Sequence, residues 1–216
     1  MRFMLCALLA ACLGRALVTQ APGGELIERT LAIVGTQVIT LSDARAAIRL
    51  GLVEAARTAD PGSVTQLLVD RELVLREVQR YAPPAPSEGS VDARMDEIRK
   101  RLPGVDELSR ALDEAGFTES RLRAWVRDDL RAVAYLAQRF ASASTPTDTE
   151  VSAAFARQRA EFERSGTTLE RAAPALRERL VVSRRRELIS DWVSDLRRRT
   201  EVVILPQVHS AHERAQ

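Results

Sequence analysis

The chain has 216 residues, which is enough for a sizeable hydrophobic core in one large or two small domains. Apolar residues make up 45% of the sequence, which excludes wholesale disorder, and the 4% of aromatic residues mean that Leu, Val, Ile and Ala must build most of the core. Without Arg2 and Arg15 near the N-terminus, 30 basic residues face 30 acidic ones, and this balance argues against nucleic-acid binding.

Residues 1–21 have the features of a secretory signal peptide. Arg2 precedes an apolar run that ends at Leu13 and is too short to span a bilayer. An alternative is a lipoprotein signal, because Leu9-Ala10-Ala11-Cys12 resembles a lipobox, in which Cys12 would be lipidated and would become the first residue. The first alternative predicts a secreted protein, and the second predicts a protein held at a membrane surface through Cys12.

A linker with Pro and two Gly, residues 22–29, leads into two β-rich runs within residues 30–40. Gly35 and Thr36 lie between the runs, and glycine at the first central position suits a type II′ hairpin turn. Thr40 or Ser42 can cap a following helix that we expect to reach about residue 57.

The middle of the chain, about residues 62–140, has apolar residues at helical spacing and predicts a series of helices. Breaks are expected at residues 83–86, at 103–104 and at Gly116, and Thr118 can cap the last of these helices.

A closing part, residues 147–205, begins with a capping box at residues 147–150 and continues as helix to a break at residues 165–166. A long helix over about residues 172–199 precedes a strand-like run at 201–205, and residues 206–216 look like a disordered tail. Because a few short strands are unstable alone, the last strand should pair with the N-terminal hairpin. The predicted fold is mainly α with a small antiparallel β element, in one core over residues 30–205.

Candidate chemical sites are few. His209, His212 and Glu213 could in principle hold a metal, but their place in the tail favours a loose end. The pair Asp128 and Asp129 is typical of a solvated helix face. No phosphate loop or catalytic motif is present, so we expect no catalytic, cofactor-binding or metal residues and no enzyme activity.

Two further features have ordinary structural interpretations. Trp125 and Trp192 lie on apolar helix stripes and are expected in the core. The arginine runs 184–186 and 197–199 alternate with acids and are expected on a salt-bridged, solvated helix face.

Four segments together resemble the SurA-like periplasmic chaperones, over about residues 28–205. The segments are a hairpin ending in an Ile-Thr-x-Ser-Asp helix entry (32–43), a Leu-Ile-Asp-Arg-like helix (67–74), a helical turn with Gly116-Phe117-Thr118-Glu119 (112–122), and a final helix and strand (177–205). Family members usually carry parvulin-type prolyl isomerase domains before the final helix. Residues 164–167 leave no room for such a domain here, because a compact domain needs on the order of a hundred residues.

The resemblance implies an ATP-independent periplasmic holdase for unfolded outer-membrane or secreted proteins, without isomerase activity and without cofactors. Its partners would be extended polypeptides, not nucleic acid, and it would meet a membrane only if lipidated at Cys12. Two other functions stay open: a degenerate prolyl isomerase with residual activity, and an envelope assembly lipoprotein.

Overall fold

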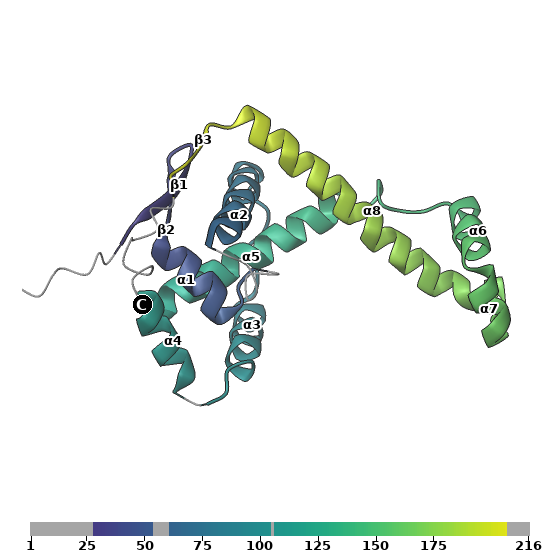
Figure 1. Ribbon diagram of the computed structural model, residues 1–216, viewed down its shortest axis with the longest axis horizontal. Coiled ribbons are helices and arrows are strands. Elements are labelled where there is room, and N and C mark those ends of the chain that lie inside the picture. The colour runs from purple at the N-terminus through teal and green to yellow at the C-terminus, as the bar shows by residue number, and fades with distance from the viewer. Residues whose placement is uncertain (1–27, 54–60, 105, 207–216) are drawn as a thin grey trace, which may run out of the picture.

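The computed structural model describes residues 28–53, 61–104 and 106–206. These residues form a mainly helical protein with one small antiparallel sheet, as the sequence predicts. The strands are β1 (Thr30–Val34), β2 (Gln37–Thr40) and β3 (Val202–Ile204), and the helices are α1 (Leu41–Leu50), α2 (Pro61–Tyr81), α3 (Glu88–Lys100), α4 (Glu107–Ala115), α5 (Glu119–Arg139), α6 (Asp148–Arg157), α7 (Arg159–Ser165) and α8 (Leu169–Arg199). The sheet and α1 to α5 form a body, and α8 extends away from it to a tip made of α6 and α7 (Figure 1).

The sheet joins the two ends of the described chain. Its strand order is β2-β1-β3, with both pairs antiparallel. Hydrogen bonds from Gly35 N to Glu201 O and from Leu205 N to Leu31 O, both 2.9 Å, lie at the two ends of the β1–β3 ladder. Because hydrogen-bonding residues alternate along a strand, Ile33, which lies opposite the middle residue of β3, directs its N–H and C=O toward β3.

The β1–β2 turn has the geometry that the sequence predicts. Val34 lies opposite Gln37, so the loop contains only Gly35 and Thr36. Gly35 has a φ of +59°, and Thr36 is not among the described residues with positive φ. Positive φ at the first central position alone is the type II′ pattern.

The first helix begins as expected but ends early. Thr40 is its N-cap and forms a capping box with Asp43. The helix ends at Leu50 rather than near residue 57, because Gly51 adopts the left-handed conformation with a φ of +60°. Leu41 N donates to Arg29 O at 2.8 Å, so residues 28 and 29 pack on the body, although the sequence placed them in the linker.

Helices α2 to α5 follow the predicted series of breaks and caps. The first of them begins at Pro61 and ends at Tyr81, just before the proline-rich residues 83–86. Gly116, with a φ of +65°, ends α4, and the Thr118 side chain accepts from Arg121 N at the start of α5.

The closing helices differ in detail from the prediction. A single helix was expected from residue 147 to residue 165, but the chain forms α6 and α7, which meet at Gln158. Gln158 has φ −109° and ψ 16°, outside the helical region, and this breaks the regular hydrogen bonding. Helix α8 begins at Leu169, three residues before the expected start.

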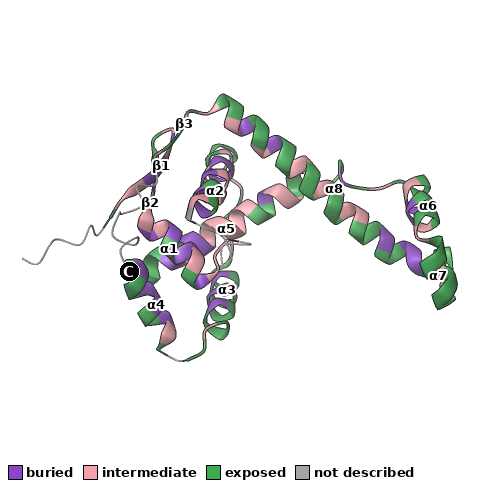
Figure 2. Cartoon of the chain, viewed as in Figure 1, coloured by how far each residue is buried: buried purple, intermediate pink, exposed green. Residues whose placement is uncertain are grey.

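The apolar residues form two separate clusters instead of one continuous core. The larger cluster fills the body, and the smaller one holds α6 and α7 on the N-terminal part of α8 (Figure 2). The buried residues of the smaller cluster are Val151, Ala154, Ala172, Ala173 and Leu176, with Phe155, Phe162 and Leu180 packed against them.

Helix α8 connects the two clusters and presents a different side to each. At 1.5 Å per residue its 31 residues span roughly 46 Å. Leu176 packs in the tip cluster and Leu196 in the body cluster, and 20 residues at about 100° each place these side chains roughly 200° apart. The tip and the body therefore lie on opposite sides of α8, as Figure 1 shows.

Candidate functional site

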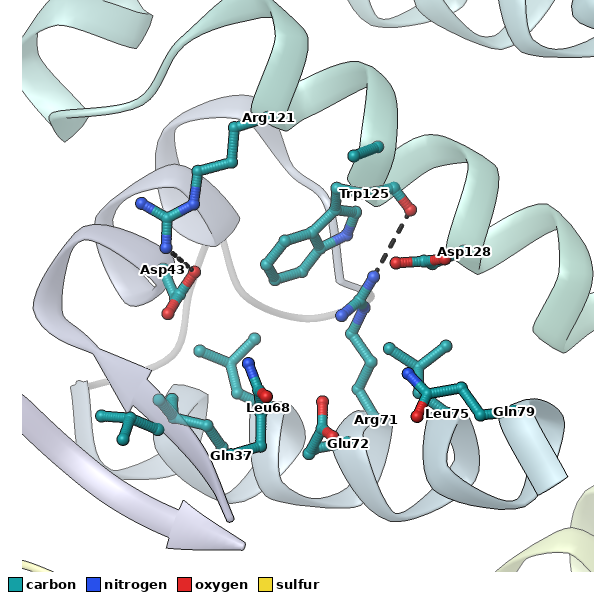
Figure 3. A pocket seen from close by; sticks show the side chains of 13 residues that line it. Gln37, Asp43, Leu68, Arg71, Glu72, Leu75, Gln79, Arg121, Trp125 and Asp128 are labelled. Carbon is teal, nitrogen blue, oxygen red and sulfur yellow. Dashed lines mark hydrogen bonds and ion pairs between the residues drawn. The ribbon is translucent and has the colours of Figure 1, made fainter.

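Residues from three of the four segments quoted in the sequence analysis, 32–43, 67–74 and 112–122, surround one pocket in the body. The pocket lies between β2, α1, α2 and α5 and has a volume of about 250 Å³ (Figure 3). Its lining combines apolar side chains with several charged ones. The lining residues are Gln37, Val38, Ile39, Asp43, Leu68, Arg71, Glu72, Leu75, Gln79, Arg121, Ala124, Trp125 and Asp128.

The helix-entry segment fixes one wall of the pocket. Asp43 accepts hydrogen bonds from Thr40 N and Thr40 Oγ1, both 2.9 Å, and so completes the cap of α1. Its other oxygen accepts from Arg121 Nη2 of α5 at 2.9 Å. The same carboxylate therefore caps one helix and ties it to another.

Glu28 strengthens this entry from the other side. Its carboxylate accepts from Ser42 N at 3.2 Å and from Ser42 Oγ at 2.5 Å. Burial acts to raise the pKa of Glu28, but the hydrogen bonds from Ser42 and from Arg29 N outweigh it, and the pKa lies below its ordinary value. The Ser of the helix-entry motif thus anchors the segment that precedes β1.

A second wall is a contact between α2 and α5. Arg71 Nε donates to Asp129 Oδ1 at 2.8 Å, and the Arg71 guanidinium lies 3.7 Å from the centre of the Trp125 ring. The Trp125 indole N–H donates to the other oxygen of Asp129 at 3.0 Å. The three side chains hold each other in one geometry, which combines an ion pair with a cation–π contact.

Burial dominates the electrostatics of Asp129. It raises the pKa of this carboxyl above its ordinary value, although Arg71 and the indole N–H act in the opposite direction. The ion pair therefore offsets only part of the cost of removing the carboxylate from water.

Glu72 faces the pocket without a partner. Its half-buried side chain forms no hydrogen bond or ion pair with any other described residue (Figure 3). Burial raises the pKa of Glu72; Arg71 and Arg76 act to lower it, while Asp128 and Asp43 act to raise it further. The pocket thus offers a carboxylate that is free to accept a hydrogen bond or to pair with a cation.

A larger, more apolar groove lies between α2, α3 and α5, with Arg71 shared between it and the pocket. Its volume is about 720 Å³. Val133 is 64% exposed at this groove, a large value for an apolar side chain. The other lining residues are Leu52, Val74, Ser90, Ala93, Arg94, Glu97, Val126, Asp129, Leu130, Ala132 and Leu136.

The residues singled out in the sequence have different outcomes. Cys12, His209, His212 and Glu213 lie outside the described residues. Within the described ranges, no group of three or more His, Cys, Asp or Glu side chains is placed to hold a metal ion. The expectation that Trp125 and Trp192 belong to the core is confirmed, since they are 8% and 9% exposed.

One interpretation of charged residues was wrong; the other, a salt-bridged face for the arginine runs, is confirmed but incomplete. The pair Asp128 and Asp129 is half-buried rather than solvated, because α2 packs over this part of α5. The arginine runs are not only a solvated face: Arg184 bonds to Glu150 of α6, and Arg197 bonds to Asp70 of α2. Both arginines therefore tie α8 to other helices.

Sequence reasoning missed Arg71 and Glu72 as pocket residues. They stand next to each other in a charged stretch of α2 that reads as an ordinary helix surface. Asp129, the partner of Arg71, is 58 residues away in the chain, and no spacing rule connects the two.

Searches of protein-family models and of curated protein sequences found no match to this chain. Among the helices of the described residues, none is both long and apolar enough to cross a membrane.

Proposed function

We propose that this protein is an ATP-independent extracytoplasmic holdase that binds unfolded outer-membrane or secreted proteins, without isomerase activity. The observation that carries the proposal is the apolar groove between α2, α3 and α5, which no described residue covers. The resemblance to the SurA-like chaperones supplies the compartment and the client class.

The groove suits a polypeptide that has not folded. Apolar side chains of such a chain lose contact with water when they enter it, and each Å² of apolar surface removed from water is worth roughly 25 cal/mol. Open apolar surfaces of this kind often mark interaction sites. Binding of this type needs no nucleotide and no catalytic residue.

The arrangement of the resembling segments adds support. The helix entry at Asp43 and the α2 segment at Arg71 both line the pocket, and the final helix reaches the same body through Arg197. Only residues 166–168 separate α7 from α8, so the proposal is a chaperone core without an isomerase domain.

The groove can be tested with one substitution. We expect the mature protein to suppress aggregation of a denatured outer-membrane barrel protein, measured by light scattering after dilution. Val133→Glu should weaken this suppression severalfold, because it places a charge among the apolar side chains of the groove. Val182→Glu is the matched control, since Val182 is also an exposed valine on a helix, at 51%, but lies outside the groove.

Two results would overturn the proposal. One is wild-type protein that does not suppress aggregation at several-fold molar excess. The other is equal activity of the Val133→Glu and Val182→Glu variants. A protease-coupled peptide assay separates the isomerase alternative: acceleration of prolyl isomerisation that a point mutation in the folded part abolishes would favour it.

A further inference from the structure

A second, smaller binding surface lies where α2 ends beside the C-terminal part of α5. This aromatic slot has a volume of about 550 Å³ and is lined by Tyr81, Ala82, Pro83, Pro84, Tyr135, Gln138 and Arg139. Tyr81 is 56% exposed, and its ring stacks on that of Tyr135 with 5.6 Å between the ring centres. The slot therefore offers the exposed ring of Tyr81, supported from behind by the buried Tyr135, beside two proline rings.

The slot also carries a cation that no carboxylate neutralises. Arg139 is exposed, and it forms no ion pair with any described residue. Its Nη1 donates to Tyr135 Oη at 3.2 Å, and its guanidinium lies 4.9 Å from the centre of the Trp192 ring. Glu77, an acid close enough to act on Tyr135, pairs with Arg80 at 3.9 Å. An anionic ligand would meet Arg139 without displacing another carboxylate.

The backbone of the slot is held in an uncommon conformation. Ala82 has a φ of +45°, and it is the one non-glycine residue with positive φ in the described ranges. A side chain in this left-handed region costs roughly 1 kcal/mol. The strained residue stands between Tyr81 and Pro83, where the backbone leaves α2 for the prolines. Strain of this kind is concentrated at functional positions in proteins.

We propose that the aromatic slot binds an extended polypeptide segment through an aromatic side chain followed by an acidic residue. The ring packs on the exposed Tyr81 beside the prolines, and the neighbouring carboxylate pairs with Arg139. The occupant is an internal segment, because the exposed lining leaves the slot open and a chain can continue past it. This proposal rests on the proposed function in that the ligand is a polypeptide, but it adds a site separate from the groove.

The slot is connected to α8. Tyr135 lies 6.2 Å from Trp192, and Phe140 lies 5.9 Å from it, measured between ring centres. The Trp192 side chain is almost fully buried, and its indole nitrogen has no hydrogen-bond partner in the described structure. A ligand at Arg139 therefore changes the environment of an indole that belongs to α8.

Binding can be measured directly with a defined peptide. The probe is acetyl-Gly-Ser-Phe-Asp-Gly-Ser-amide, titrated into the mature protein by calorimetry and by the two indole N–H signals in ¹⁵N NMR. The Trp125→Phe variant assigns the remaining signal to Trp192. We expect saturable binding that shifts the Trp192 signal. Replacing Phe by Leu or Asp by Asn in the peptide should weaken binding at least about tenfold.

Protein variants test the assigned roles. Arg139→Gln should weaken the Phe-Asp peptide about tenfold and leave the weak Phe-Asn peptide within twofold, and Arg139→Lys should restore part of the affinity. Arg157→Gln is the matched control, because Arg157 is another exposed arginine without an ion pair among the described residues. If the Arg139→Gln variant does not fold, Tyr81→Ser provides a second test at an exposed position. It should weaken binding of the Phe-Asp peptide, because it removes the ring on which the peptide's phenylalanine packs.

These experiments test the proposed peptide binding at the aromatic slot and not the proposed binding at the groove. Equal binding of the Phe-Asp and Phe-Asn peptides, or equal effects of Arg139→Gln and Arg157→Gln, would overturn the proposal. Binding only of a peptide that ends in a phenylalanine with a free carboxylate would overturn the internal segment as occupant. None of these results depends on aggregation suppression, so failure here is distinct from failure of the groove.

Discussion

Glu72 lies in an environment that its neighbours in the chain do not predict. It follows Arg71, which pairs with Asp129, and yet it has no partner of its own in the described structure. Packing between α2 and α5 also partly removes it from water. Arg71 and Arg76 come from its own helix, whereas the opposing acids Asp43 and Asp128 face it from α1 and α5. The net result of burial and these charges is a raised pKa.

The raised pKa of Glu72 makes the stability of the folded state depend on pH in a definite direction. Because the folded state holds the Glu72 proton more tightly than the unfolded state does, the contribution of Glu72 is most favourable below its unfolded pKa, near 4.5, and is lost as the pH rises through the folded value. We expect Glu72→Gln to raise the melting temperature at pH 7 and to have little effect near pH 4. Thermal unfolding over this pH range checks the prediction. Glu178→Gln, at an exposed position, is the control and should leave the melting temperature at pH 7 nearly unchanged.

At the scale of elements, the short strand β3 determines how the body closes. It has three residues, yet it places Val203 opposite Ile33 and brings the end of α8 beside the first strand. Because Ile33 directs its N–H and C=O toward β3, Val203 directs its own toward β1, whereas those of Val202 and Ile204 point to the free edge of the sheet.

This difference predicts unequal effects of proline in the same strand. Val203→Pro removes a ladder hydrogen bond and should lower the free energy of unfolding by roughly 2 kcal/mol. Ile204→Pro removes an N–H that faces the free edge and should cost less than about 1 kcal/mol. Chemical denaturation of the two variants measures both values, and equal losses would show that the assigned hydrogen-bond direction is wrong.

At the scale of the whole molecule, two hydrophobic clusters are joined by one helix. The tip cluster and the body cluster share α8 but no buried side chain. Arg184 and Glu150 add an ion pair between α8 and α6, and Glu150 also accepts from Thr147 N. The pKa of Glu150 is lowered to about 2, first by the hydrogen bond from Thr147 N and then by Arg184. The tip is therefore held by local contacts of its own.

Independent clusters predict independent opening. Leu176→Ala removes a side chain that is 2% exposed in the tip cluster and should locally cost roughly 2–4 kcal/mol. We expect faster hydrogen exchange in α6 and α7 with unchanged exchange in α2 and α5. Leu122→Ala, in the body cluster, should show the reverse pattern. Faster exchange in α2 and α5 after Leu176→Ala would mean that the two clusters unfold together.

The sequence determined the features that depend on neighbours within a few residues. The turn at Gly35, the caps at Thr40, Thr118 and Thr147, and the helix stop at Gly116 all follow from local backbone and side-chain geometry. The early end of α1 at Gly51 and the break at Gln158 were missed although they are local. An apolar pattern that continues past a helix end does not reveal the backbone angle at the end itself.

Only the tertiary structure decided which distant side chains meet. Asp129 looks solvated in its own helix, and α2 turns it into the buried partner of Arg71 and Trp125. Glu72 becomes an unpaired pocket residue for the same reason. The apolar side chains of α8 likewise reach two clusters on opposite sides of the helix, with Leu176 in one and Leu196 in the other. Sequence spacing fixes the direction of a side chain on its own helix, whereas burial and pairing depend on what packs against that side.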